Sequence, residues 1–145
     1  MLIKNKNIVV GITGGIAAYK SLEVVRLLKK EGAKVFPIMT KAATEFVAPL
    51  SFATLSENYV ATDLFTPRSG QGLSHLKPAE IADVLLVAPA TANIIGKLAN
   101  GIADDLLSTV LMATKAPILL APAMNTNMYE SLAVRENIAK LKKRG

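Results

Sequence analysis

The sequence predicts an α/β protein with a three-layer, Rossmann-like fold, in which helices flank a parallel sheet. Short runs that are apolar at nearly every position alternate with longer segments whose apolar residues recur every three to four positions. A strand that is apolar on both faces is buried on both, as in parallel sheets covered by helices. Glycine and proline separate the two kinds of segment.

Local signals place the predicted elements in the first half of the chain. Gly32 follows the last apolar residue of a helical pattern, where glycine commonly ends a helix. Thr40 follows a strand and can cap a short helix with its side chain. The predicted elements, in order, are a strand over 7–13, a helix over 16–31, a strand over 33–39, a short helix from Thr40, a short helix over 49–56 and a short strand over 59–63.

The second half of the chain follows a predicted loop over residues 66–73, which are rich in Pro, Gly and Ser. Pro78 is compatible with a helix only near its first turn. No repeat or linker divides the chain, so we predict one domain. The predicted elements, in order, are a helix over 75–82, a strand over 83–88, helices over 91–99 and 103–114, a buried strand over 117–121 and a helix over 128–143 with one break.

Composition excludes several classes of function. Of the 145 residues, 51% are hydrophobic and 19% are charged, and no apolar run is long enough to span a membrane. The chain has no cysteine and one histidine, too few ligands for a zinc site. Much of the net charge of +6 lies in Lys and Arg residues at 140–144, which suit a solvated helix end. We expect a cytoplasmic protein that holds no metal and binds neither membrane nor nucleic acid.

Small and polar residues follow the predicted strands, and these positions carry the chemistry. Ligands of open parallel sheets bind beyond the carboxyl ends of the strands, where the strand order reverses. Two buried strands each end in Ala-Pro-Ala and then supply an asparagine. The phrases that follow the four main strands are TGGI at 13–16, MTK at 39–41, APATAN at 88–93 and APAMN at 121–125.

The glycine pair Gly14-Gly15 has two interpretations. Glycines between a strand and a helix let backbone N–H groups face an anion, and Thr13 can add a hydroxyl donor. The pair also suits a purely structural tight turn. The order of glycines is not that of the dinucleotide fingerprint, and Tyr19 stands where a P-loop needs its second glycine.

The two asparagines also have two interpretations. Asn93 can simply cap its helix, and Asn125 can cap a turn. For either phrase alone, the structural interpretation is the better one. Two such phrases next to a glycine turn, at one edge of a predicted sheet, favour a binding site.

These phrases resemble one family. TGGIAAYK, MTKAA, SHL, APATANIIGKLANGIADDLL and PAMNTNM follow one another as they do in the homo-oligomeric flavin-containing cysteine decarboxylases. The resemblance covers essentially the whole chain. It is strongest to the phosphopantothenoylcysteine decarboxylase branch of coenzyme A biosynthesis. It implies a flavoprotein domain over residues 1–145, which we expect to be truncated at its C-terminus.

The resemblance implies FMN as the cofactor, bound at a subunit interface of a homo-oligomer, which is a homotrimer or an assembly of trimers. It implies that His75 is the catalytic base and that Asn125 binds the carboxylate of the substrate. The small-molecule substrate would be 4′-phosphopantothenoylcysteine, oxidised at the carbon that bears sulfur and decarboxylated towards 4′-phosphopantetheine. The implied FMN contacts are Thr13, Gly14, Gly15, Ile16, Thr40, Thr91, Ala92, Asn93 and Ala123.

The chain also departs from this branch. The family's decarboxylases of coenzyme A biosynthesis carry a later flap whose cysteine protonates the ene-thiol, and this chain has no cysteine. The residues of this chain therefore do not account for the protonation of the ene-thiol that completes turnover. A peptidyl-cysteine decarboxylase of the same family, which stops at the ene-thiol, and a non-catalytic FMN-binding or regulatory subunit stay open as alternatives.

Overall fold

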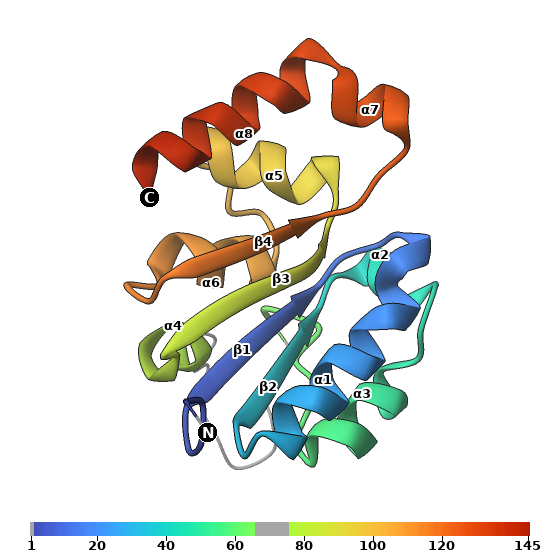
Figure 1. The fold of residues 1–145 in the computed structure, drawn as a ribbon, viewed down its shortest axis with the longest axis vertical. Coiled ribbons are helices and arrows are strands. Elements are labelled where there is room, and N and C mark those ends of the chain that lie inside the picture. Colours follow the sequence, from blue (N-terminus) through green and yellow to red (C-terminus); the bar gives the residue numbers. More distant parts are fainter. Residues whose placement is uncertain (1, 66–75) are drawn as a thin grey trace.

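The computed structural model describes residues 2–65 and 76–145, and its centre is a parallel sheet. Within this part of the chain the sheet has four strands in the order β2-β1-β3-β4 (Figure 1). Every neighbouring pair is parallel, and β1 is paired with β2 from Asn7–Lys34 to Ile12–Met39. The strands are β1 (Asn7–Ile12), β2 (Lys34–Met39), β3 (Val84–Ala90) and β4 (Ile118–Pro122).

Helices connect the strands. A 3₁₀ turn leads into α1, and α5 packs beside α8 above β4 (Figure 1). Together with the sheet they confirm the predicted α/β fold. The helices are η1 (Ile16–Tyr19), α1 (Lys20–Lys30), α2 (Lys41–Thr44), α3 (Pro49–Ser56), α4 (Lys77–Ile81), α5 (Ala92–Asn100), α6 (Leu106–Ala113), α7 (Thr126–Glu130) and α8 (Leu132–Arg144).

The sheet separates two hydrophobic cores. Side chains alternate between the faces of a strand, so Ile8 and Val10 of β1 join one core while Val9 joins the other. The first core packs under η1, α1 and α3, and the second under α4, α5 and α6. This arrangement confirms the prediction that helices cover both faces of the central strands.

Several predicted boundaries are confirmed by their local signals. Gly32 follows α1 with φ +83, a left-handed conformation that glycine adopts without strain. Thr40 caps α2 by accepting a hydrogen bond from the N–H of Ala43. The break predicted in the last helix falls at Ser131, between α7 and α8, where Ser131 caps α8.

Three expectations about the elements are wrong. Residues 59–63 form only an isolated bridge at Ala61, which bonds to Pro37 and Met39 at the side of β2. The helix predicted from residue 103 begins at Leu106, because Asp105 caps it. The last strand was expected to be buried, yet Leu119 of β4 is 60% exposed because β4 is an edge strand.

The remaining expectations concern membrane, metal and the loop. Among the described residues, none of the helices combines the length and the hydropathy that a bilayer crossing requires. The same residues contain no cluster of acidic, His or Cys side chains suited to a metal ion. The predicted loop at 66–73 and His75 lie outside the described residues.

Candidate functional site

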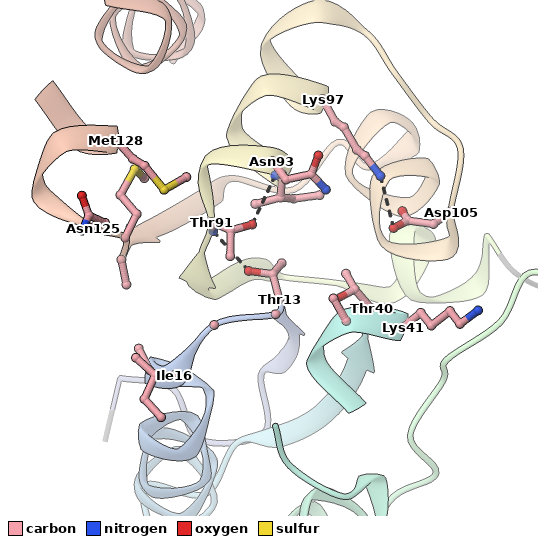
Figure 2. Close-up of a pocket in the computed structure, with 17 residues that line it drawn as sticks. Thr13, Ile16, Thr40, Lys41, Thr91, Asn93, Lys97, Asp105, Asn125 and Met128 are labelled. Atoms are coloured by element: carbon pink, nitrogen blue, oxygen red, sulfur yellow. Dashed lines mark hydrogen bonds and ion pairs between the residues drawn. The ribbon is translucent and has the colours of Figure 1, made fainter. Parts of the chain in front are cut away.

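The candidate site lies at the carboxyl ends of the strands, between β1 and β3. From β1 the chain passes to β2 on one side, whereas β3 lies on the other side, so the strand order reverses here. A cavity of about 570 Å³ opens at this point (Figure 2), within the size range of small-molecule sites. Of the predicted site residues that the structure describes, all line this cavity except Ala92.

The two glycines of the turn have different surroundings. A Cβ on Gly14 would clash with the Cβ of Ala42, so this glycine allows the turn to pack against α2. A Cβ on Gly15 would meet only the Thr91 side chain, at 3.8 Å. Neither N–H donates to a described residue. The structural interpretation of the turn therefore holds for Gly14, while Gly15 leaves open space and a free donor at the cavity.

Thr13 fastens the ends of β1 and β3 together. Its side chain is buried, and its hydroxyl donates to the carbonyl oxygen of Pro89 at 2.5 Å and accepts from the N–H of Thr91 at 3.1 Å. The hydroxyl hydrogen is therefore committed within the protein. In this structure Thr13 holds the cavity wall in place, and its contact with a ligand stays a prediction. Ser21 adds a second buried link, donating to the carbonyl oxygen of Ala88.

Two threonines on opposite sides of the glycine turn have free hydroxyl hydrogens. Thr40 caps α2 and Thr91 caps α5, each through its oxygen accepting a backbone N–H. Neither hydroxyl donates to a described residue. Because a hydroxyl can accept and donate at once, both side chains can donate to a ligand in the cavity (Figure 2).

The two asparagines differ in how their amides are used. Thr91 rather than Asn93 caps α5, so the capping interpretation of Asn93 is wrong. Asn93 makes no side-chain hydrogen bond to a described residue, and it lines the cavity. Asn125 does cap α7, because its Oδ1 accepts from the N–H of Asn127 at 2.8 Å. Its amide N–H₂ keeps both donors for a ligand.

Sequence reasoning missed the charged residues of the cavity, Lys41, Lys97 and Asp105. Lys97 lies one helical turn after Asn93, a spacing that places both on one face of α5. Its Nζ is 2.7 Å from Asp104 Oδ1 and 3.7 Å from Asp105 Oδ2. The hydrogen bond between Lys97 and Asp104 is the main cause that raises the pKa of Lys97 and lowers that of Asp104. Lys97 and Asp104 are thus charged and paired at neutral pH.

Apolar side chains line another part of the cavity. Ile16, Met124 and Met128 contribute to it, and Ile16 is 77% exposed. Figure 2 shows Ile16, Asn125 and Met128 on one side of Thr13, and Lys97 and Asp105 on the other side. The cavity therefore offers backbone and hydroxyl donors in the middle, an apolar region with an amide at one side and charges at the other.

This fold and this site define an α/β protein with a small-molecule cavity at the switch point of a parallel sheet, lined by hydrogen-bond donors and apolar side chains. Glycine turns and small residues admit ligands close to the backbone. The sequence model of the Flavoprotein family matches residues 2–145, and the chain belongs to this family.

Individual relatives are similar over the whole chain. The coenzyme A biosynthesis bifunctional protein CoaBC of Haemophilus influenzae is 48% identical over 145 residues, which are 100% of this chain and 36% of that protein. The chain thus spans little more than a third of the length of this curated relative.

Two solved structures share the fold. The FMN-dependent cysteine decarboxylase SpaF has a TM-score of 0.91 and 31% identity, over 100% of this chain and 83% of that chain. A PPC decarboxylase mutant complexed with pantothenoylaminoethenethiol has a TM-score of 0.80 and 27% identity, over 97% of this chain and 79% of that chain.

Proposed function

We propose that this chain is an FMN-dependent carboxy-lyase that decarboxylates 4′-phosphopantothenoylcysteine towards 4′-phosphopantetheine in coenzyme A biosynthesis. The observation that carries the proposal is the combination of Gly15, with open space and a free N–H, and an apolar region in one cavity. The similarity to CoaBC over the whole chain and to the PPC decarboxylase structure supports it.

The residues of the cavity fit FMN. A phosphate needs several donors close to the backbone, which the N–H groups of Gly14 and Gly15 and the hydroxyls of Thr40 and Thr91 can provide. The flat ring needs apolar surface, which Ile16 and the two methionines supply. We propose that Asn93 and Ala123 line the same ligand, with Thr13 holding the wall behind it, whereas Ala92 lies outside the cavity lining.

FMN, when bound, supplies an electron sink for oxidation of the substrate carbon that bears sulfur. Asn125 binds the substrate carboxylate through its amide N–H₂ while its oxygen caps α7. His75, outside the described residues, acts as the base, since an imidazole titrates near neutral pH. The later protonation of the ene-thiol is assigned to no residue of this chain, which has no cysteine.

The first test is the visible absorption spectrum of the purified protein, with the heat-released ligand identified by mass. We expect a flavin spectrum and free FMN, together with release of CO₂ from 4′-phosphopantothenoylcysteine. A protein that neither carries nor takes up FMN would overturn the proposal.

A variant of Asn125 tests the binding of the carboxylate. Asn125→Asp keeps the oxygen that caps α7 but replaces the amide donors with a negative charge. We expect kcat/KM for decarboxylation to fall roughly 100-fold, because a charge-assisted hydrogen bond becomes a repulsion. FMN affinity should stay within about 2-fold. Asn127→Ala is the matched control, since Asn127 contacts Asn125 only through its backbone N–H. Equal losses in the two variants would contradict the role of Asn125.

A peptide with a C-terminal cysteine is the second candidate substrate. It is favoured by the high structural similarity to the cysteine decarboxylase SpaF. Comparing CO₂ release from the two substrates at equal concentration separates the candidates.

We also propose that residues 1–145 form one flavoprotein domain, that the protein is cytoplasmic and that it assembles as a homotrimer. The exposed apolar side chains of β4, α7 and α8, such as Leu119 and Leu132, support self-association. Sedimentation equilibrium measures the mass of the assembly, and a monomer at micromolar concentration would contradict the trimer.

A further inference from the structure

Only one of the two lysines in the cavity has an uncompensated charge. Lys97 is held by Asp104 and Asp105, so its charge is already neutralised by carboxylates. Lys41 forms no ion pair with any residue in 2–65 or 76–145, and its side chain is exposed. Since Lys97 and Asp105 cancel, the charged side chains lining the cavity leave the single positive charge of Lys41.

Lys41 lies beside the glycine turn. It is the first residue of α2, and its neighbours Thr40 and Ala42 line the same cavity. Ala42 is the residue that an added Cβ on Gly14 would strike, so this segment packs directly on the turn. The N–H of Thr40 bonds to the carbonyl oxygen of Ile12 at 3.0 Å, which holds the ends of β2 and β1 together.

Lys41 is among the residues that line the cavity, and in Figure 2 its side chain extends from α2 away from Thr13. Four methylene groups carry its ammonium, which can therefore swing over a group bound at the turn. A phosphate monoester carries a charge of about −1.5 to −2 near neutral pH. The donors described above for the turn are all uncharged, and they satisfy hydrogen bonds without neutralising this charge.

We propose that Lys41 is a specificity residue, whose ammonium pairs with the phosphate of the bound flavin and makes the site select FMN over riboflavin. This inference rests on the proposed function. If the charge of Lys41 acts on the phosphate alone, its removal changes the affinity for FMN. The affinity for riboflavin then stays the same.

The test measures dissociation constants for FMN and riboflavin by quenching of flavin fluorescence on titration with the apoprotein. In Lys41→Met we expect FMN to bind about 5- to 10-fold more weakly, the size of a partly exposed charge-assisted hydrogen bond. Riboflavin affinity should not change. Lys41→Arg should keep most of the preference for FMN, and higher salt should reduce the preference of the wild type but not that of Lys41→Met.

Lys34→Met is the matched control. Lys34 begins β2, at the opposite end of the strand from Lys41, and is also exposed. Lys34→Met changes the net charge by the same amount as Lys41→Met. It should leave the dissociation constants for FMN and riboflavin unchanged. The inference is overturned if Lys41→Met binds FMN as tightly as the wild type, or if it loses FMN and riboflavin affinity alike. An apoprotein that binds neither flavin overturns the proposed function itself.

Discussion

At the scale of single residues, Gly14 and Gly15 are adjacent and yet differ in what they allow. Gly14 lets the turn after β1 touch α2, because a side chain there would strike Ala42. Gly15 is extended, with φ −158, and has no close neighbour that a methyl group would displace. The first glycine is therefore needed for packing, and the second leaves room at the cavity.

This difference predicts opposite effects of two alanine substitutions. Gly14→Ala should lower the free energy of unfolding by roughly 1–3 kcal/mol, since α2 must shift. Gly15→Ala should change it by less than about 0.5 kcal/mol, while weakening FMN because the methyl group occupies ligand space. Urea unfolding of the apoprotein and FMN titration measure the two effects. A Gly15→Ala variant that is less stable than Gly14→Ala would contradict this assignment.

At the scale of elements, Asp83 joins the start of β3 to the start of β1. Its Oδ2 accepts from the N–H of Asn7 at 2.7 Å, and its own N–H donates to the carbonyl oxygen of Asn7 at 2.8 Å. Lys6 lies 3.4 Å from the other carboxylate oxygen. The hydrogen bond from Asn7, followed by the contact with Lys6, lowers the pKa of Asp83 from its ordinary value of 3.8.

A lowered carboxyl pKa makes stability depend on pH in acid. The folded pKa of Asp83 lies below its unfolded value, so its contribution is present above about pH 4 and is lost as the pH falls through the folded pKa. The urea midpoint of the wild type should fall as the pH is lowered from 5 to 2.5. In Asp83→Asn we expect this fall to be smaller. Glu136→Gln, which removes an exposed carboxylate on α8, is the control and should keep the acid dependence of the wild type. If the urea midpoint falls equally with pH in the wild type, Asp83→Asn and Glu136→Gln, the role of Asp83 is contradicted.

At the scale of the whole molecule, the cavity exists only in the folded chain. Its walls come from the ends of all four strands, which are far apart in sequence. Thr13 and Pro89, for example, are 76 residues apart and share a hydrogen bond. A ligand that binds this cavity therefore binds the native state and not the unfolded one.

Ligand binding should accordingly stabilise the whole fold. With FMN at 100 times its dissociation constant, the free energy of unfolding should rise by about 2.7 kcal/mol. The urea midpoint, followed by far-UV circular dichroism, should increase steadily with FMN concentration. Adenosine monophosphate, a phosphate ester with a different ring, is the control and should shift the midpoint less. A midpoint that is independent of FMN would show that the folded cavity does not bind it.

The sequence by itself determined most of the elements and the residue types that follow the strands. Apolar runs predicted the four strands, and the caps at Thr40 and the left-handed Gly32 were predictable because such signals act over a few residues. Apart from SHL, the phrases that carry the family resemblance each supply residues of the cavity lining. These features depend on neighbours in the chain, and the sequence displays them directly.

Only the tertiary structure decided which partner each side chain finds. It assigned the hydroxyl of Thr13 to Pro89, the cap of α5 to Thr91 instead of Asn93, and the charge of Lys97 to two carboxylates. It also placed β4 at the edge, where Leu119 is exposed. Each outcome depends on strand order and on contacts between distant segments, which no local pattern of residues specifies.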